Sequence, residues 1–204
     1  MSAGSPVFSK TYPQDSVAFD APQALRYAGL PADARDGVFD ECLAAALPVC
    51  TYRVCYREFM LAHTPDGLDL GFAVVPSRDL AKALSGCERL VLFAATVGIG
   101  IDRLIARCGK LSPAKALYFQ AIGAERAESL CDVFCRDLAA AYREKGYLSR
   151  PRYSPGYGDL PLALQKDVFA VLDCPRRIGL TLNDSLLMSP SKSVTAVVGL
   201  KPAT

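Results

Sequence analysis

The strongest constraint on the fold is a long helix-forming stretch that starts at Ser112-Pro113 and continues to about Lys145. Serine followed by proline is typical of a helix start, because serine caps free N–H groups and the fixed φ of proline suits the first helical position. Gly146 is a stop signal. The first half of the stretch is rich in alanine and glycine, which lets another backbone approach closely. We therefore expect one helix over residues 113–145, packed tightly against a neighbouring element.

Three segments are typical of strands. Residues 51–59 are rich in aromatic and β-branched side chains with partial alternation, whereas residues 88–96 and 193–200 are nearly continuous apolar runs that indicate buried strands. Helices and strands do not follow a regular βαβ order, so we predict an α+β fold on a mostly antiparallel sheet. The 204 residues fit a single domain, 1–204, in which residues 1–30 form a largely irregular segment that wraps the surface.

Local signals predict several shorter elements. Asp33 can cap a helix that ends before Pro48, and Asp66-Gly67 indicates a turn whose hairpin partner is residues 68–75. A further helix is expected over residues 162–172, followed by a turn around Cys174-Pro175.

Charge excludes some classes of partner. The chain has 23 basic and 21 acidic residues, and the basic ones are scattered, so we expect no nucleic acid or membrane surface as a partner. No apolar run approaches the roughly 20 residues of a spanning helix, and the N-terminus lacks a signal pattern. We expect a cytoplasmic protein.

The eight cysteines leave two interpretations open. There is no C-x-x-C pair, and His63 is the only histidine, which disfavours zinc. Cys131 and Cys135 share a helix face, so a metal or redox pair is conceivable. The favoured alternative is that the thiols are reduced, buried and act as small apolar side chains.

Residues 149–161 contain the most distinctive loop of the chain. Prolines stiffen it, Gly156 permits unusual φ values, and Arg152 can grip a carboxylate with both arms of its guanidinium. Residues alone leave two interpretations open, an anion or amino-acid clamp and a rigid surface turn with a solvated arginine.

The long helix carries the carboxylates Glu125, Glu128 and Asp132. Glu128 and Asp132 are four apart and share a face, so they can hold a cationic group or a ribose hydroxyl, although spacing alone favours a solvated helix face. Gly98-Ile-Gly-Ile-Asp after a strand hints at a dinucleotide-binding loop, but Arg103 occupies the place of the third glycine, which disfavours that interpretation.

Three motifs in the last third of the chain occur in a familiar order. They are R-x-x-x-G-Y at Arg152–Tyr157, the pair Gln165-Lys166, and S-x-x-M-x-P-x-x-S-V at Ser185–Val194. Over residues 120–200 the chain resembles the activation domain of cobalamin-dependent methionine synthase. The segment Leu92–Asp102 is similar to small stand-alone homologues of that domain.

This resemblance implies a C-shaped α+β domain that binds S-adenosylmethionine in its concave face. Arg152 matches the arginine that contacts the methionine carboxylate, and Ser154 matches a position whose backbone contacts the ligand. Gly156 and Tyr157 match the glycine and tyrosine of the motif.

Other positions match less closely. Glu128 falls where the family has a ligand-contacting glutamate. Val198 falls where the family often has an aromatic contact, so we expect that interaction to be lost or altered here. The family's aspartate near the start of the domain has no counterpart here, and the histidine that often precedes the motif lysine is Gln165 in this chain.

The resemblance also implies a role in trans. In the family, the domain supplies the methyl donor when oxidised cobalamin is reduced and remethylated. His63 lies outside any D-x-H-x-x-G motif, so cobalamin must come on a partner chain, either a methionine synthase core or another corrinoid protein. A flavodoxin-like or ferredoxin-like electron donor is a further expected partner. The alternative is a non-catalytic docking or sensing partner of a corrinoid methyltransferase.

Overall fold

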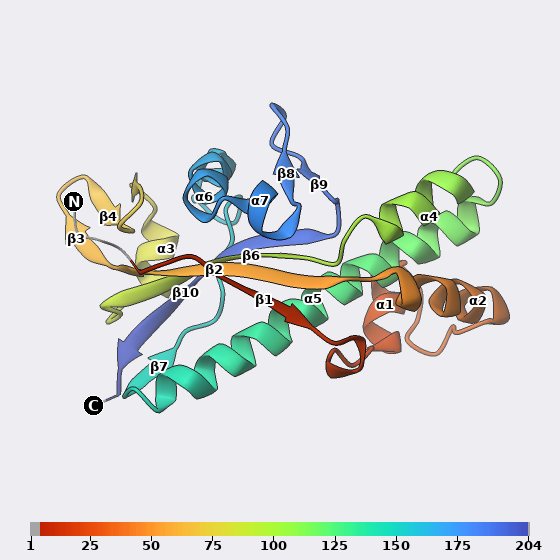
Figure 1. Ribbon diagram of the computed structural model, residues 1–204, viewed down its shortest axis with the longest axis horizontal. Helices are drawn as coiled ribbons and strands as arrows, with labels where there is room; N and C mark the ends of the chain where they lie inside the picture. Colours follow the sequence, from red (N-terminus) through yellow and green to blue (C-terminus); the bar gives the residue numbers. More distant parts are fainter. Residues whose placement is uncertain (1–4, 204) are drawn as a thin grey trace.

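The computed structural model describes residues 5–203 and is organised around a five-stranded sheet (Figure 1). All neighbouring strands in this sheet are antiparallel. In spatial order the strands are β1 (Phe8–Tyr12), β2 (Tyr52–Met60), β6 (Arg89–Thr96), β10 (Ser193–Pro202) and β7 (Tyr147–Ser149). The α+β prediction with a mostly antiparallel sheet is confirmed.

Strand β6 lies at the centre of this sheet and is buried on both faces. Alternate side chains of a strand point to opposite faces, so an unbroken apolar run serves two cores. Phe93 belongs to the core on one face, and Leu92 belongs to the core on the other. This explains why residues 89–96 show no alternation of polar and apolar residues.

One face of the sheet is covered by α5 (Pro113–Arg143), the long helix that the sequence predicted. At 1.5 Å per residue its 31 residues span about 46 Å, and Figure 1 shows it running beneath the strands. Gly123 provides the expected close approach, because a Cβ there would lie 2.7 Å from Cγ2 of Ile101. Within the described residues, no helix combines the length and the apolar character needed to cross a membrane.

Three helices pack around the first half of α5, at one end of the molecule. They are α1 (Ala21–Tyr27), α2 (Gly37–Ala46) and α4 (Gly100–Cys108). Two short 3₁₀ turns accompany these helices: η1 (Gln14–Ser16) precedes α1, and η2 (Leu47–Val49) follows α2.

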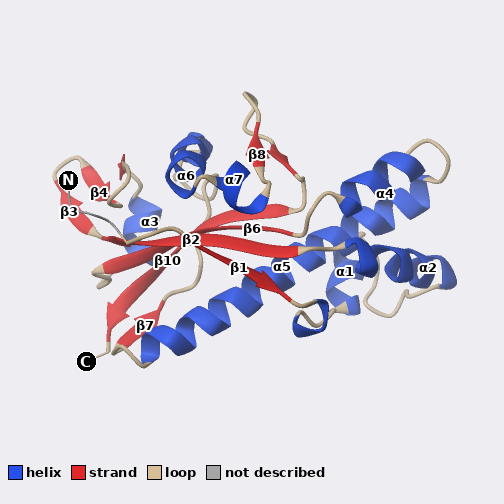
Figure 2. Cartoon of the chain, in the orientation of Figure 1, coloured by secondary structure: helices blue, strands red, loops and turns tan. Residues whose placement is uncertain are grey.

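The opposite face of the sheet carries smaller elements, as Figure 2 shows. Its helical elements are α3 (Arg78–Ala83), η3 (Leu162–Leu164), α6 (Gln165–Leu172) and α7 (Cys174–Ile178). Two small sheets complete the fold: β3 (Ala62–Thr64), β4 (Gly67–Asp69) and β5 (Val74–Val75) form one, and β8 (Thr181–Leu182) and β9 (Met188–Ser189) form the other.

Four local predictions need correction. Within residues 1–30, of which 1–4 lie outside the described residues, β1 is a regular edge strand, because backbone pairing with β2 does not require alternation. Asp36, not Asp33, caps α2 by accepting from the N–H of Phe39 at 2.7 Å. Residues 68–75 contribute to two short strands, β4 and β5, and residues 174–178 form a helical turn.

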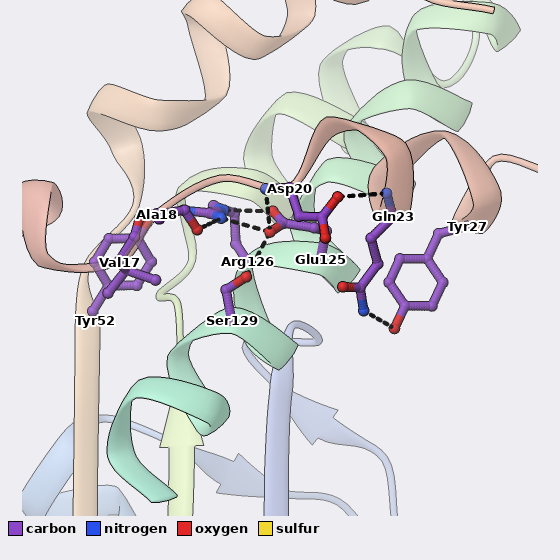
Figure 3. Close-up of polar contacts among 9 residues, drawn as sticks. All are labelled: Val17, Ala18, Asp20, Gln23, Tyr27, Tyr52, Glu125, Arg126 and Ser129. Atoms are coloured by element: carbon purple, nitrogen blue, oxygen red, sulfur yellow. Dashed lines mark hydrogen bonds and ion pairs between the residues drawn. The ribbon is translucent and has the colours of Figure 1, made fainter. Parts of the chain in front are cut away.

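Glu125 is not on a solvated helix face, because it forms a buried ion pair with its neighbour Arg126. The two side chains are 0% and 1% exposed, and two nitrogens of Arg126 lie 2.6 Å from the two carboxylate oxygens (Figure 3). Burial by itself lowers the pKa of Arg126, but the contact with Glu125 raises it above its ordinary value, so the guanidinium stays charged.

This ion pair fastens the N-terminal segment to α5. Arg126 donates to the carbonyls of Val17 and Ala18 at 2.8 and 2.5 Å, and Glu125 accepts from the N–H of Asp20 at 3.0 Å (Figure 3). All three guanidinium nitrogens and both carboxylate oxygens therefore have hydrogen-bond partners, as a buried ion pair requires.

We predict that Arg126→Met lowers the free energy of unfolding by about 3–5 kcal/mol, because it leaves the buried Glu125 carboxylate without a positive charge to pair with. Urea unfolding measures this. Arg143→Met, at an exposed position on the same helix, is the control and should change stability by no more than about 0.5 kcal/mol. Adding Glu125→Gln to Arg126→Met should recover part of the loss. A loss of less than about 1 kcal/mol for Arg126→Met would contradict this interpretation.

Candidate functional site

The arginine loop, residues 150–161, is held along the outer edge of β10. The N–H of Tyr153 donates to the carbonyl of Val197, and the N–H of Val197 donates to the carbonyl of Tyr153, both at 2.9 Å. The N–H of Arg150 donates to the carbonyl of Gly199 at 2.8 Å. The loop therefore continues the sheet after β7, and its backbone is fixed on both sides of Arg152.

The far end of the arginine loop is fixed by Asp159. Its carboxylate accepts from the N–H groups of Arg78 and Asp79, at 2.7 and 3.2 Å, and from the hydroxyl of Ser77. The hydrogen bond from Ser77 holds the pKa of Asp159 below its ordinary value. The loop thus caps α3, a role that its composition alone did not indicate.

Arg152 extends from this fixed backbone to α5. One terminal nitrogen lies 2.5 Å from a carboxylate oxygen of Glu128, and the other lies 2.5 Å from one of Asp132. Burial alone lowers the pKa of Arg152, but the hydrogen bond to Asp132 and the charge of Glu128 raise it above its ordinary value. The structure therefore places Arg152 in contact with Glu128 and Asp132, three candidate residues that the sequence alone did not connect.

A cleft of about 790 Å³ opens beside this cluster, between α5 and the arginine loop. Glu128 and Arg152 line it, together with Ser154 and Tyr157 from the loop. The Tyr157 ring is 69% exposed and stands at the rim. Four of the six candidate residues thus surround one cavity whose volume suits a small-molecule ligand.

Gly156 shapes the loop rather than lining the cleft. Its φ is 92°, a conformation that favours glycine, and its N–H donates to the carbonyl of Leu160 at 2.9 Å. A Cβ there would lie 3.2 Å from Cδ1 of Leu162. Gly156 therefore permits the tight turn that brings Ser154 and Tyr157 to the cleft.

Val198 does not line the cleft. It is 1% exposed and packs within the core between the sheet and α5, so it presents no surface to a ligand in this conformation. Val194 is on the same face of β10 and lines the cleft instead. The sequence alone could not show which of Val194 and Val198 lines the cleft, because both side chains lie on the face of β10 that packs against α5.

A smaller cavity of about 200 Å³ adjoins the main cleft and shares Glu128 and Val194 with it. Ala124 and Ala127 of α5 line it, together with Lys192. Burial lowers the pKa of Lys192, whose ammonium donates to the side chain of Gln120 at 2.5 Å. The small alanine side chains extend the cleft along the helix.

The cysteines and His63 do not form a recognisable metal site. Among residues 5–203, no group of three or more histidine, cysteine or acidic side chains is placed to hold a metal ion. Cys131 is fully buried, and burial raises its pKa well above the ordinary value. Burial also raises the pKa of Cys135, which lines the cleft, while Arg152 opposes the rise. His63 is an exposed residue of β3 that pairs with Leu68.

Comparison with known proteins identifies a fold. The sequence matches no family model and no curated protein. The structure, however, is similar to the crystal structure of the MetH reactivation domain bound to AdoHcy, with a TM-score of 0.72. The match covers 99% of this chain and 80% of that one, at 14% sequence identity. This chain shares the fold of that domain.

Proposed function

We propose that this chain binds S-adenosylmethionine in the cleft beside Arg152 and presents it as a methyl donor to cobalamin carried by a separate chain. The observation that carries the proposal is the placement of the Arg152 guanidinium on the wall of a ligand-sized cleft. The fold of a domain whose crystal structure contains AdoHcy supports it. Arginine is suited to a ligand carboxylate because it binds both oxygens at once.

The present partners of Arg152 are exchangeable. Its side chain is 25% exposed, that of Glu128 is 34% exposed and that of Asp132 is 66% exposed. Ion pairs that are this accessible to water contribute about 0–1 kcal/mol, so a ligand carboxylate can replace one of them at little cost. We propose that the ligand displaces Asp132, the more exposed partner.

The charge of the cluster complements the ligand. One arginine and two carboxylates carry a net charge of −1, whereas a carboxylate, an ammonium and a sulfonium together carry +1. Once Asp132 is displaced, Glu128 remains as an acceptor for the ligand ammonium. The adenosyl group then fits the adjoining cavity above Ala124 and Ala127.

The chain's own contribution to methyl transfer is positional. When bound, S-adenosylmethionine supplies an electrophilic methyl group, and no general base is required for its transfer. Arg152 and Glu128 orient the amino-acid end, the loop backbone at Ser154 supports the ligand, and Tyr157 covers the rim. The methyl acceptor comes on a methionine synthase core or another corrinoid protein, with a flavodoxin-like or ferredoxin-like protein as electron donor.

Calorimetric titration with S-adenosylmethionine tests the proposal. We predict binding by the wild type and a loss of about 2–5 kcal/mol in binding free energy for Arg152→Ala, since it removes a two-armed charged pair that the bound ligand shields from water. The control is Arg143→Ala, on the same side of the sheet but outside the cleft, which should bind like the wild type. Absence of binding by the wild type contradicts the proposal.

Asp132→Asn should behave in the opposite way. Because Asp132 competes with the ligand for Arg152, its neutralisation should leave binding unchanged or strengthen it by up to about fivefold. Glu128→Gln is the matched comparison and should weaken binding, because it removes the proposed partner of the ligand ammonium. If both variants weaken binding equally, Asp132 is not a competitor, and the proposed exchange of partners is wrong.

A docking or sensing module without methyl transfer is the second candidate. It is favoured by the burial of Val198, which leaves the cleft without a side chain from a position that is often an aromatic contact in the family. Mixing the protein with a corrinoid-bearing partner, a reductant and S-adenosylmethionine separates the two functions. Methylcobalamin formation that depends on Arg152 supports the first function, whereas complex formation without remethylation supports the second.

A further inference from the structure

A second large cleft, of about 540 Å³, lies where the chain leaves β6 and enters α4. Its walls come from the entry to β2, the start of α4 and the end of α7. It shares no lining residue with the cleft beside Arg152 or with the cavity that adjoins it. Any ligand here is therefore separate from the proposed methyl donor.

Three arginines line this second cleft, and none of the described residues in its walls is acidic. Arg53 comes from β2, while Arg103 and Arg107 are one turn apart on α4 and share a face. Within residues 5–203, none of these three forms an ion pair, whereas four other arginines do: Arg35, Arg89, Arg126 and Arg152. All three are exposed, and their positive charges, gathered around one cavity, attract an anion into it.

The nearest carboxylate on α4 is engaged elsewhere. Asp102 accepts from the N–H of Ser191 at 2.9 Å and from the hydroxyl of the same residue. Gly100, the first residue of α4, also lines the second cleft, so the positive end of the helix dipole adds to the field of the arginines. Helix α4 therefore supplies most of the positive charge of the cavity, and its own carboxylate does not neutralise that charge.

The remaining walls are largely apolar and include Val49, Ile99, Leu104 and Ile178. Ile99 is 40% exposed, so an apolar surface is available beside the guanidinium groups. The cavity thus combines a cationic side with an apolar side. That combination suits a molecule with a planar or apolar body and an anionic end.

The two glycines of Gly98-Ile-Gly have a structural explanation of their own. A Cβ at Gly98 would lie 2.2 Å from Oγ1 of Thr51, and one at Gly100 would lie 2.3 Å from the carbonyl oxygen of Val49. Their role is to let the α4 entry pack against the entry to β2. A ligand in this cleft is therefore indicated by the arginines and the cavity, not by a glycine motif.

We propose that the second cleft binds a phosphate-bearing small molecule of nucleotide size. Arg53, Arg103 and Arg107 hold the phosphate groups, because guanidinium groups bind phosphate oxygens in a bidentate manner. The apolar wall at Ile99 and Leu104 holds the body of the ligand.

Calorimetry with ADP, inorganic pyrophosphate and adenosine tests this proposal. ADP supplies body and phosphate, pyrophosphate supplies the charge alone, and adenosine supplies the body alone. We expect ADP to bind more tightly than either fragment, and Arg103→Gln/Arg107→Gln to weaken ADP binding about tenfold or more. The matched control, Arg26→Gln/Arg143→Gln, removes two exposed arginines outside the cleft and should leave binding within about twofold.

Several results would overturn the proposal. They are an absence of ADP and pyrophosphate binding by the wild type, equal weakening by the control pair, and tighter binding of a short DNA duplex than of ADP.

Arg152→Ala must retain ADP binding, which excludes the methyl-donor cleft as the ADP site. Arg103→Gln/Arg107→Gln must retain S-adenosylmethionine binding if the proposed function holds, so the two proposals fail independently. Because both arginines are exposed, this variant should keep the wild-type melting temperature when no ligand is present.

Discussion

Helix α5 carries two ion pairs of opposite character within a few residues of each other, and the rest of the structure depends on that contrast. Glu125 and Arg126 are removed from water and bonded on every side, so separating them leaves a buried charge. Arg152 and its two carboxylates remain accessible to water, so their separation costs little. The first pair fixes the helix beneath the sheet, and the second leaves an arginine free to exchange partners.

The helical period explains how one element serves both purposes. Residues 125 and 129 face the N-terminal segment, where Ser129 donates to Glu125 at 2.6 Å, whereas residues 128 and 132 face the arginine loop. The loop is in turn aligned by its backbone bonds to β10 and by the capping of α3 by Asp159. The site is thus built from rigid elements, which lowers the entropic cost of orienting a ligand.

The sequence predicted what local patterns control. The long helix, the central strand and the loop around Arg152 follow from capping, apolar runs and proline content. The features that the sequence did not predict depend on contacts between elements that are far apart in the chain. The edge strand β1 forms by pairing with its neighbour β2, and Glu125 is buried because the N-terminal segment crosses it. The pairing of Arg152 with Asp132 could not be predicted either, since their side chains meet only when β10 and α5 are both in place.

A crystal structure of this protein with AdoHcy bound would show whether Arg152 exchanges Asp132 for a ligand carboxylate. We predict that the ligand carboxylate forms two hydrogen bonds with Arg152, that Asp132 has moved away, and that the adenosyl group lies above Ala124 and Ala127. A structure with AdoHcy bound elsewhere, or one in which Arg152 still pairs with both Glu128 and Asp132, would contradict it.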